Sequence, residues 1–141
     1  MTSARRRGSG LLELALGLPV LVLLLVGMGQ MAYTILVFQQ LSHAVRGGAR
    51  YAANAPFDGD PQAYAQRVRN AVVYGVPEGG AGSEARAPGL NPEHVDVSWA
   101  PGRSGVPETI TITLRGYSVP WLFRTITLQG RPRATVSYAA E

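Results

Sequence analysis

The sequence predicts an α+β protein: a long N-terminal transmembrane helix that continues outside the membrane, then a short helix and a small antiparallel β-sheet. Two observations support this fold class. Residues 14–38 form an apolar run of 25 residues without a charge, and a hydrocarbon core about 30 Å thick needs about 20 helical residues. Residues 109–115 alternate between polar and branched apolar side chains, as a half-buried strand does.

Composition limits the function classes. The chain has 141 residues, 46% of them hydrophobic, which suits one small domain with an appendage and excludes a disordered polyelectrolyte. It has no cysteine, so disulfides and thiolate metal sites are excluded. Five arginines and one acid lie in residues 1–55, whereas residues 56–141 hold eight of each. The outer part therefore has no basic surface for nucleic acid.

The apolar run is predicted to span a membrane with its N-terminus in the cytoplasm. Three arginines at residues 5–7 precede the run, and only Arg46 and Arg50 follow it closely. Because cytoplasmic flanks carry the excess of arginine, an extracytoplasmic α+β domain is predicted at residues 56–141.

Three other interpretations of this run have features that argue against them. A body of this size hardly encloses a buried helix that is apolar on every side. A cleaved secretory signal would end before Gln30, but the run continues to Phe38. Residues 27–32 fit a dinucleotide-binding G-x-G-x-x-A pattern, which needs an acid about 20 residues later. No acid occurs between Glu13 and Asp58.

The helical pattern continues beyond the membrane to residue 55, ahead of Pro56. Pro19 is expected to open the helix locally near its start, and the glycine pair at residues 47–48 is expected to allow a bend. One seam of the outer turns is predicted to pack along another helix, and the alternative is packing on the protein's own outer domain. Its residues, spaced three and four apart, are Phe38, Leu41, Val45, Gly48 and Ala52.

The outer domain is predicted to begin with a short helix at residues 60–75. Asp60 suits its N-cap and Pro61 its first position. A long loop is expected at residues 75–107, which hold seven glycines and five prolines. Strands are predicted at residues 94–100, at 109–115 with a bend at Gly116 before 117–119, around 126–128 and around 136–138.

The sequence offers little for catalysis. His43 and His94 lie far apart, no spacing suggests a metal site, and residues 102–105 are one residue short of G-x-S-x-G. We therefore expect no enzyme activity, no cofactor and no metal. Three aromatic residues are expected to pack in the core, with an exposed recognition patch as the alternative: Trp99, Tyr117 and Trp121.

Glu13 is the unusual residue of the N-terminal segment. A carboxylate at the start of an apolar helix is costly in hydrocarbon, although the positive end of the helix dipole favours an acid there. Counting Ser9 as the first residue after Gly8, Glu13 is the fifth. These physical arguments leave two roles open for Glu13, that of an interfacial acid and that of a functional residue.

These residues resemble the TadE-like pseudopilins of tight-adherence, or Flp-type, pili. The resemblance is strong over residues 5–55 and looser over residues 94–141. Leu14 stands where an aromatic residue is common in the family. The matching features are the basic tail that ends in Gly8, Glu13 at the fifth position after it, Leu18-Pro19, and the R-x-G-A-R-x-A-like stretch at residues 46–52.

The resemblance implies a division into a leader at residues 1–8, a helix at residues 9–55 and the outer domain. A prepilin peptidase would cut between Gly8 and Ser9, and Glu13 would neutralise the new amine of a neighbouring subunit. The implied partners are this peptidase, the major Flp-type pilin, a second pseudopilin, the inner-membrane assembly platform and the membrane.

The sequence thus predicts a non-enzymatic minor pilin, or pseudopilin, for Flp-type pilus assembly. It would be a single-pass protein of the inner membrane, with the pilus as a second location. The alternative is a membrane-anchored extracytoplasmic binding module that does not enter a pilus.

Overall fold

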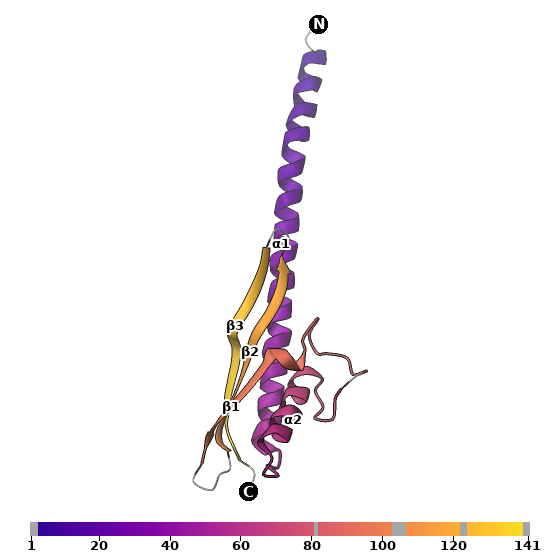
Figure 1. Ribbon diagram of the computed structural model, residues 1–141. Coiled ribbons are helices and arrows are strands. Elements are labelled where there is room, and N and C mark those ends of the chain that lie inside the picture. Colours follow the sequence, from indigo (N-terminus) through magenta and orange to yellow (C-terminus); the bar gives the residue numbers. More distant parts are fainter. Residues whose placement is uncertain (1–2, 81, 103–106, 122–123, 140–141) are drawn as a thin grey trace. The chain divides into compact units, whose positions relative to one another are not determined.

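The computed structural model describes residues 3–80, 82–102, 107–121 and 124–139 (Figure 1). The chain divides into two compact units, Met1–Ile35 and Leu36–Glu141. The first unit is helical throughout its described part, and the second holds the remaining elements. The α+β class predicted from the sequence is confirmed.

Helix α1 spans Ser3–Asn54 and has 52 residues. It begins six residues before the predicted start at residue 9, because arginine is a good helix former and extending an existing helix costs little. The chain remains helical through Pro19 and through residues 47–48, where the sequence suggested a local opening and a bend.

Within the first unit, α1 has apolar residues on all sides from residue 14 onward. The most apolar window of its described residues has a mean hydropathy of 2.5 over 18 residues, and none of that window is buried. Helix α1 is therefore a candidate membrane span by length and composition.

The second unit continues with helix α2, Pro61–Val73. The Asp60 side chain accepts hydrogen bonds from the backbone N–H groups of Gln62 and Ala63, at 2.9 and 3.2 Å. Pro61 occupies the first turn, where a missing N–H costs nothing. The cap and proline positions predicted from the sequence are confirmed.

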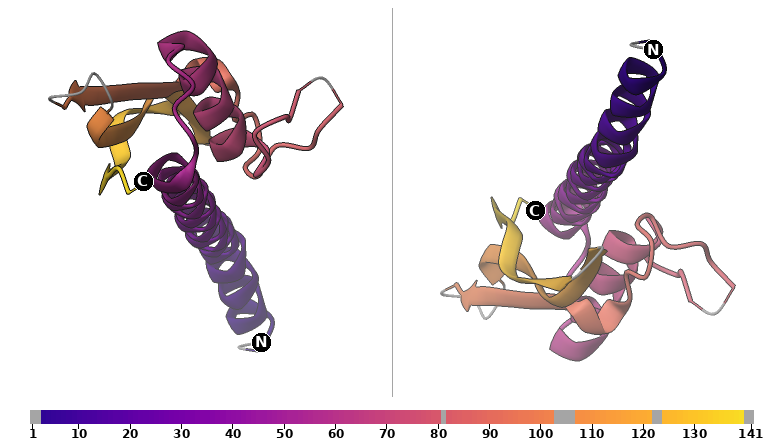
Figure 2. Two further views of the ribbon diagram at one scale, coloured as in Figure 1. Left: turned by 90° about the horizontal axis from the view of Figure 1, so that it is seen from below. Right: turned by 90° about the horizontal axis from the view of Figure 1, so that it is seen from above.

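Three antiparallel strands follow, in the spatial order β1-β2-β3. A short 3₁₀ helix, η1 (Pro92–His94), leads into β1 (Val95–Pro101), and β2 (Pro107–Trp121) pairs with both β1 and β3 (Arg124–Ser137). Figure 2 shows the segment between α2 and η1 extending away from the sheet and from α2.

The two strands predicted around residues 126–128 and 136–138 are wrong as separate elements. They are parts of the single strand β3. The alternation is interrupted near Pro132, where the register with β2 shifts between Thr113 and Arg115. An edge strand tolerates a proline and an irregular ladder at such a point, so pairing resumes on both sides.

The bend predicted at Gly116 is confirmed as a bulge. The register shifts between Arg115 and Tyr117, and Gly116 has a φ of 69°. This left-handed conformation is cheap only for a residue without a Cβ. The extra residue restores the inward direction of Tyr117, so the buried face of β2 continues toward its end.

One face of the sheet packs against α2 and the part of α1 that belongs to the second unit. The strand phase predicted for β2 is confirmed, because Ile110, Ile112 and Leu114 are fully buried while the threonines between them are partly exposed. The core comprises Val37, Leu41, Ala44, Val45, Ala49, Ala52, Ala55, Tyr64, Val68, Val72, Val73, Ala87, Leu90, Val95, Val97, Ile110, Ile112, Leu114, Tyr117 and Val119.

The last turn of α1 is closed by groups distant in sequence. The Tyr64 hydroxyl donates to the carbonyl of Ala52. The backbone N–H of Ala139 donates to the carbonyl of Ala53 at 2.9 Å, and the Tyr138 hydroxyl donates to that of Ala55 at 3.1 Å. These bonds satisfy carbonyls that a helix end leaves unpaired, and they hold Tyr138 and Ala139 beside the end of α1.

Candidate functional site

The predicted processing segment lies in the first unit. Gly8, Ser9 and Glu13 belong to the helical backbone of α1, with Glu13 about one turn after Ser9. Glu13 is exposed and forms no hydrogen bond or ion pair with other residues that the structure describes. Its carboxylate is therefore available to water or to a group on another molecule.

Two glycines flank Glu13 on the same helix face. Gly10 precedes it by three residues and Gly17 follows it by four, and both line a shallow hollow of about 460 Å³ with Glu13. A Cβ at either glycine would meet nothing within 4 Å. Small residues let a second helix approach closely in a membrane. This face was not predicted from the sequence, although its glycines lie three residues before and four residues after Glu13.

The predicted packing seam divides between two environments. Leu41, Val45, Gly48 and Ala52 are buried within the second unit, so the alternative interpretation, packing on the protein's own outer domain, describes these four. Phe38 is 42% exposed. Of the five residues, only Phe38 presents a large apolar surface to another molecule.

Gly48 has a specific packing role. A Cβ at this position would lie 2.1 Å from Cγ2 of Val72 and 3.2 Å from its Cα. Only glycine lets α1 and α2 approach this closely, since a real Cβ atom almost never comes so near another atom. The glycine that suggested a bend instead allows α1 and α2 to pack closely within the second unit.

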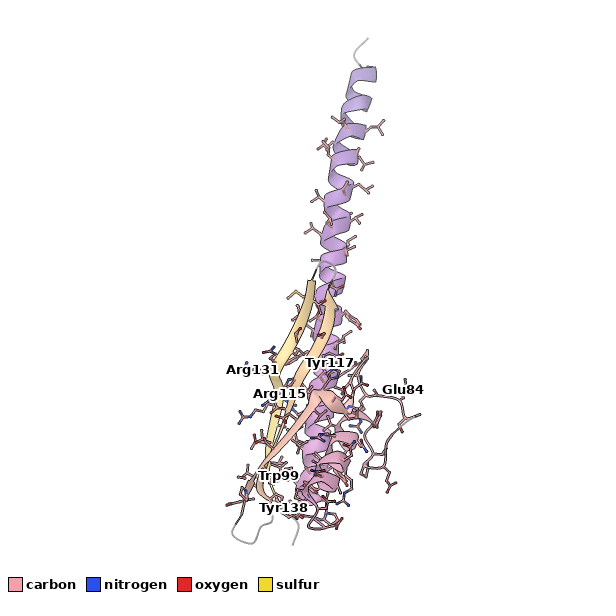
Figure 3. The ribbon with its side chains drawn as sticks, in the orientation of Figure 1. Glu84, Trp99, Arg115, Tyr117, Arg131 and Tyr138 are labelled. Carbon is pink, nitrogen blue, oxygen red and sulfur yellow. The ribbon has the colours of Figure 1, made fainter. Side chains whose placement is uncertain are left out.

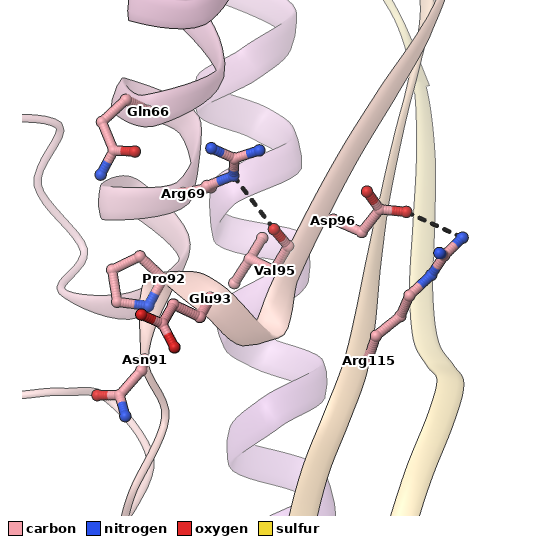
Figure 4. A pocket seen from close by; sticks show the side chains of 8 residues that line it. All are labelled: Gln66, Arg69, Asn91, Pro92, Glu93, Val95, Asp96 and Arg115. Atoms are coloured by element: carbon pink, nitrogen blue, oxygen red, sulfur yellow. Dashed lines mark hydrogen bonds and ion pairs between the residues drawn. The ribbon is translucent and has the colours of Figure 1, made fainter.

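The outer domain has an open polar groove of about 680 Å³ beside β1 (Figure 4). Arg69 of α2 donates from Nε to the carbonyl of Val95 at 3.2 Å. Arg115 of β2 pairs with Asp96 of β1 at 3.0 Å. The remaining lining residues are Gln66, Asn91, Pro92 and Glu93. Two guanidinium groups and two carboxylates balance in charge, so the groove attracts neither cations nor anions strongly.

The residue types that catalyse reactions or bind metals in other proteins are dispersed in this chain or have structural roles. His43 is exposed, whereas Nδ1 of His94 accepts the N–H of Asn91 at 3.1 Å. No group of three His, Cys, Asp or Glu that would hold a metal occurs among the described residues. The near-match to G-x-S-x-G at residues 102–105 falls mostly outside the part of the chain that the structure describes.

The aromatic residues considered for a recognition patch do not form one surface. Tyr117 is buried and donates from its hydroxyl to the carbonyl of Pro88. Trp99 is half-buried and meets Tyr64 edge-on, with ring centroids 6.4 Å apart. The side chain of Trp121 lies outside the described part of the structure.

Tyr64 is the titratable group most changed by the fold. Burial raises the pKa of Tyr64 to about 12, and the nearby Tyr138 and Tyr51 add to the effect. The neutral phenol is therefore favoured over a wide range of pH, which suits a hydroxyl that donates a hydrogen bond to the end of α1. Tyr64 thus has a structural role.

Comparison with known proteins identifies the N-terminal segment. Residues 8–50 match the model of a family described as TadE-like protein. No curated protein and no solved structure matches the chain significantly. The resemblance predicted from the sequence is thereby confirmed, and the match supports a pilin-like protein of the Tad system.

Proposed function

From the TadE-like segment at residues 8–50, we propose that this chain is a non-enzymatic minor pilin, or pseudopilin, for Flp-type pilus assembly. The observation that carries the proposal is the matched segment itself, which begins at Gly8 and includes Glu13, exposed on an apolar helix and unpaired among the residues that the structure describes. Such a helix needs lipid or other helices around it.

Processing after Gly8 would change the electrostatics of the helix end. It would remove three arginines and leave a positively charged amine on Ser9 at the start of α1. A helix N-terminus disfavours positive charge, so an acid from a neighbouring subunit would stabilise it. Glu13 is exposed and unpaired in the described structure, and the glycines on its face admit a close helix.

The partners follow from this role. The proposal names a prepilin peptidase, the major Flp-type pilin, a second pseudopilin and the inner-membrane platform. The protein would sit in the inner membrane with residues 56–141 outside. Protease added to spheroplasts should therefore digest that domain, and its complete protection until the membrane is opened would contradict the orientation.

The cleavage site is tested by Gly8→Val, with Gly10→Val as the matched control. A side chain at the residue before the cut should block trimming, whereas the same side chain two residues later should not. N-terminal mass spectrometry of protein from its own host measures the outcome. Trimming of Gly8→Val at the parent's rate would contradict cleavage at this position.

The role of Glu13 is tested by Glu13→Ala against the exposed neighbour control Leu12→Ala. Glu13→Ala should insert and be cleaved, yet recover about tenfold less of the major pilin on co-purification, because an unpaired amine in a low-dielectric bundle is costly. Leu12→Ala should behave like the parent. Equal recovery with both variants would remove the pairing role.

A second candidate is a membrane-anchored binding module that stays out of the pilus. The polar groove beside β1 favours it, because the groove is open and holds charged side chains of both signs. The N-terminal mass separates the candidates: a start at Ser9 supports the pilin, whereas an intact start supports the plain anchor.

A further inference from the structure

The outward face of the sheet carries two arginines without an acidic partner among the residues that the structure describes. These are Arg131 and Arg133, called here the arginine pair, and both are exposed on β3. Neither forms an ion pair with another described residue. Arg115 lies nearby on β2, but Asp96 already pairs with it at 3.0 Å. Within the described residues, this face therefore keeps an excess of positive charge.

Acidic side chains lie in the segment between α2 and η1. Residues 76–91 hold two glutamates and one arginine. Glu78 and Glu84, called here the glutamate pair, are exposed and form no ion pair with a described residue. The guanidinium of Arg86 lies back against the helices: a Cβ at Gly75 would be 2.3 Å from its Nη2, and one at Gly47 would be 2.9 Å from its Nη1. The glutamates are therefore the outward charges of this segment.

The two pairs lie at a similar level of the second unit. Figure 3 shows Arg131 and Glu84 on opposite sides of the outer turns of α1, with Arg115 beside Arg131. Contacts agree with this view, because Glu84 and Pro88 line one hollow. The Pro88 carbonyl accepts a hydrogen bond from Tyr117, which follows Arg115 closely on β2. Opposite charges are thus presented at one level and on opposite sides.

This arrangement suits contact between copies of the chain that point in the same direction. Copies inserted in one membrane share the direction of α1, so the arginine pair of one copy can face the glutamate pair of its neighbour at equal height. A two-fold contact through either pair would instead bring like charges together. Because the two surfaces differ, the favourable contact is heterologous and leaves one surface of each kind free for the next copy.

We propose that a second copy of this chain docks its glutamate pair on the arginine pair of β3, so that copies in one membrane associate side by side. The proposal rests on membrane insertion of α1, which is part of the proposed function, and it is independent of processing. It adds the chain itself to the proposed partners.

The contact depends on the membrane and on ionic strength. Exposed ion pairs contribute little individually and are screened by salt. Confinement of the copies to one membrane raises their effective concentration, so several weak pairs can act together. Complementary charges also set the register of a contact and disfavour wrong arrangements. The test therefore uses the full chain in its own membrane.

Introduced thiols can report this contact without background, because the chain has no cysteine. Ser83→Cys lies beside Glu84 and is exposed. Gln129→Cys lies two residues before Arg131 on the same exposed side of β3. Both substitutions leave every charge in place. Two differently tagged chains, one with each substitution, are produced together in the host membrane and treated with a short bifunctional maleimide.

A cross-link between the two tagged chains is expected. It should exceed the product from either single variant alone at least about fivefold, because the contact joins different surfaces. Ser137→Cys is the control for Gln129→Cys, since it is exposed on β3 and lies roughly 26 Å further along the strand. Equal product with this control would mean that copies meet without a fixed orientation, which would overturn the proposal.

Charge reversal tests the ion pairs themselves. Arg131→Glu with Arg133→Glu should reduce the cross-link about threefold or more, and so should Glu78→Arg with Glu84→Arg. A chain with all four substitutions should recover the parent's cross-link among its own copies, because its charges again complement each other. Failure of this recovery, in a chain that still reaches the membrane, would overturn the assignment of the two pairs.

A matched control separates these pairs from overall charge. Arg46→Glu with Arg50→Glu changes the net charge by the same amount at exposed positions of α1, and should cross-link like the parent. Raising the salt to about 1 M, where charges are screened beyond about 3 Å, should reduce the parent's cross-link about threefold. An equal loss with the α1 control and with the reversed arginine pair would show that net charge, rather than this surface, governs association.

Three further outcomes distinguish this proposal from the proposed function. If the chain is in the membrane but the mixed variants give no product above the Ser137→Cys control, self-association is wrong and membrane insertion stands. If the chain is absent from the membrane fraction, the membrane part of the proposed function fails and the side-by-side contact fails with it. If Gln129→Cys cross-links to a different protein instead, that protein covers the arginine pair and the proposal is overturned.

Discussion

Helix α1 places similar side chains in opposite surroundings. Leu24 in the first unit is 62% exposed, whereas Leu41 in the second unit is fully buried. The difference lies in the pattern. Beyond residue 36 the apolar residues form one stripe opposed by polar ones, and before it they surround the helix. A stripe is satisfied by a domain on one side, whereas an apolar cylinder needs lipid or several helices.

The two parts of α1 therefore differ in what covers their apolar surface: the chain itself covers one part, and the other part needs lipid or other molecules. The outer turns of α1 are covered by α2 and the sheet, so they contribute to the stability of the second unit. The most apolar 18-residue window of α1, in contrast, has no buried residue within the described structure. Substitutions in the two parts should therefore change different measurements.

The largest effect is expected in the sheet that covers α1. Ile112→Asp places a charge where the parent side chain is fully buried, and should lower the free energy of unfolding by about 4 kcal/mol or more. Thr111→Asp, on the partly exposed face, should cost much less. Urea unfolding of the full chain in detergent, followed by tryptophan emission, measures both. Equal losses would show that the covering face is wrongly assigned.

A somewhat smaller effect is expected from leucine substitutions, one in each part of α1. Leu41→Ala removes a fully buried side chain and should destabilise the second unit by about 3 kcal/mol. Leu24→Ala, from an exposed position, should leave the unfolding of that unit unchanged. The same urea titration applies to both variants. A loss of stability with Leu24→Ala would mean that the apolar turns also support the outer domain.

Local signals in the sequence predicted much of this fold. The N-cap and first position of α2 follow from Asp60-Pro61, because capping depends on neighbouring residues alone. The inward face of β2 follows from strict alternation, and the bulge from Gly116. The candidate membrane span was also predicted, because the length of an uncharged run lies within one stretch of chain.

The features that were not predicted depend on distant contacts. The hydrogen bond from the Tyr138 hydroxyl that closes the end of α1 joins groups 83 residues apart. No local sequence pattern predicts such a bond. β3 appeared as two strands because Pro132 interrupts its alternation, although β2 holds both parts in register. The close approach of Val72 to Gly48 was not predicted for the same reason. A glycine in a helix predicts lower helix stability, and its packing role becomes clear only when the neighbouring residue is known.

The closure of α1 should make stability depend on pH. The pKa of Tyr64 is about 12 in the folded chain and 10.0 ordinarily, so the folded state keeps a proton that the unfolded chain loses. Its contribution is complete below pH 10 and falls as the pH rises toward 12, by about 1.4 kcal/mol per pH unit. Unfolding measured across this range should show a steeper loss for the parent than for Tyr64→Phe. Equal slopes would mean that the phenol titrates normally.

The smallest effect is expected for glycine substitutions in α1, which test its two parts separately. Gly48→Ala brings a Cβ to 2.1 Å from Cγ2 of Val72, so the helices must separate, at a cost of about 1–3 kcal/mol. Gly27→Ala meets nothing within 4 Å and should leave the unfolding of the second unit unchanged. Urea titration of each variant in detergent measures the difference.

A double variant decides whether the loss comes from this contact. Val72→Ala removes the Cγ2 atom that a Cβ at Gly48 would meet. If overpacking is the cause, Gly48→Ala combined with Val72→Ala should lose less stability than the sum of the two single changes, because residues in contact are not additive. A strictly additive loss would mean that Gly48→Ala acts elsewhere in the helix. The close approach of α1 and α2 would then not be what requires glycine at this position.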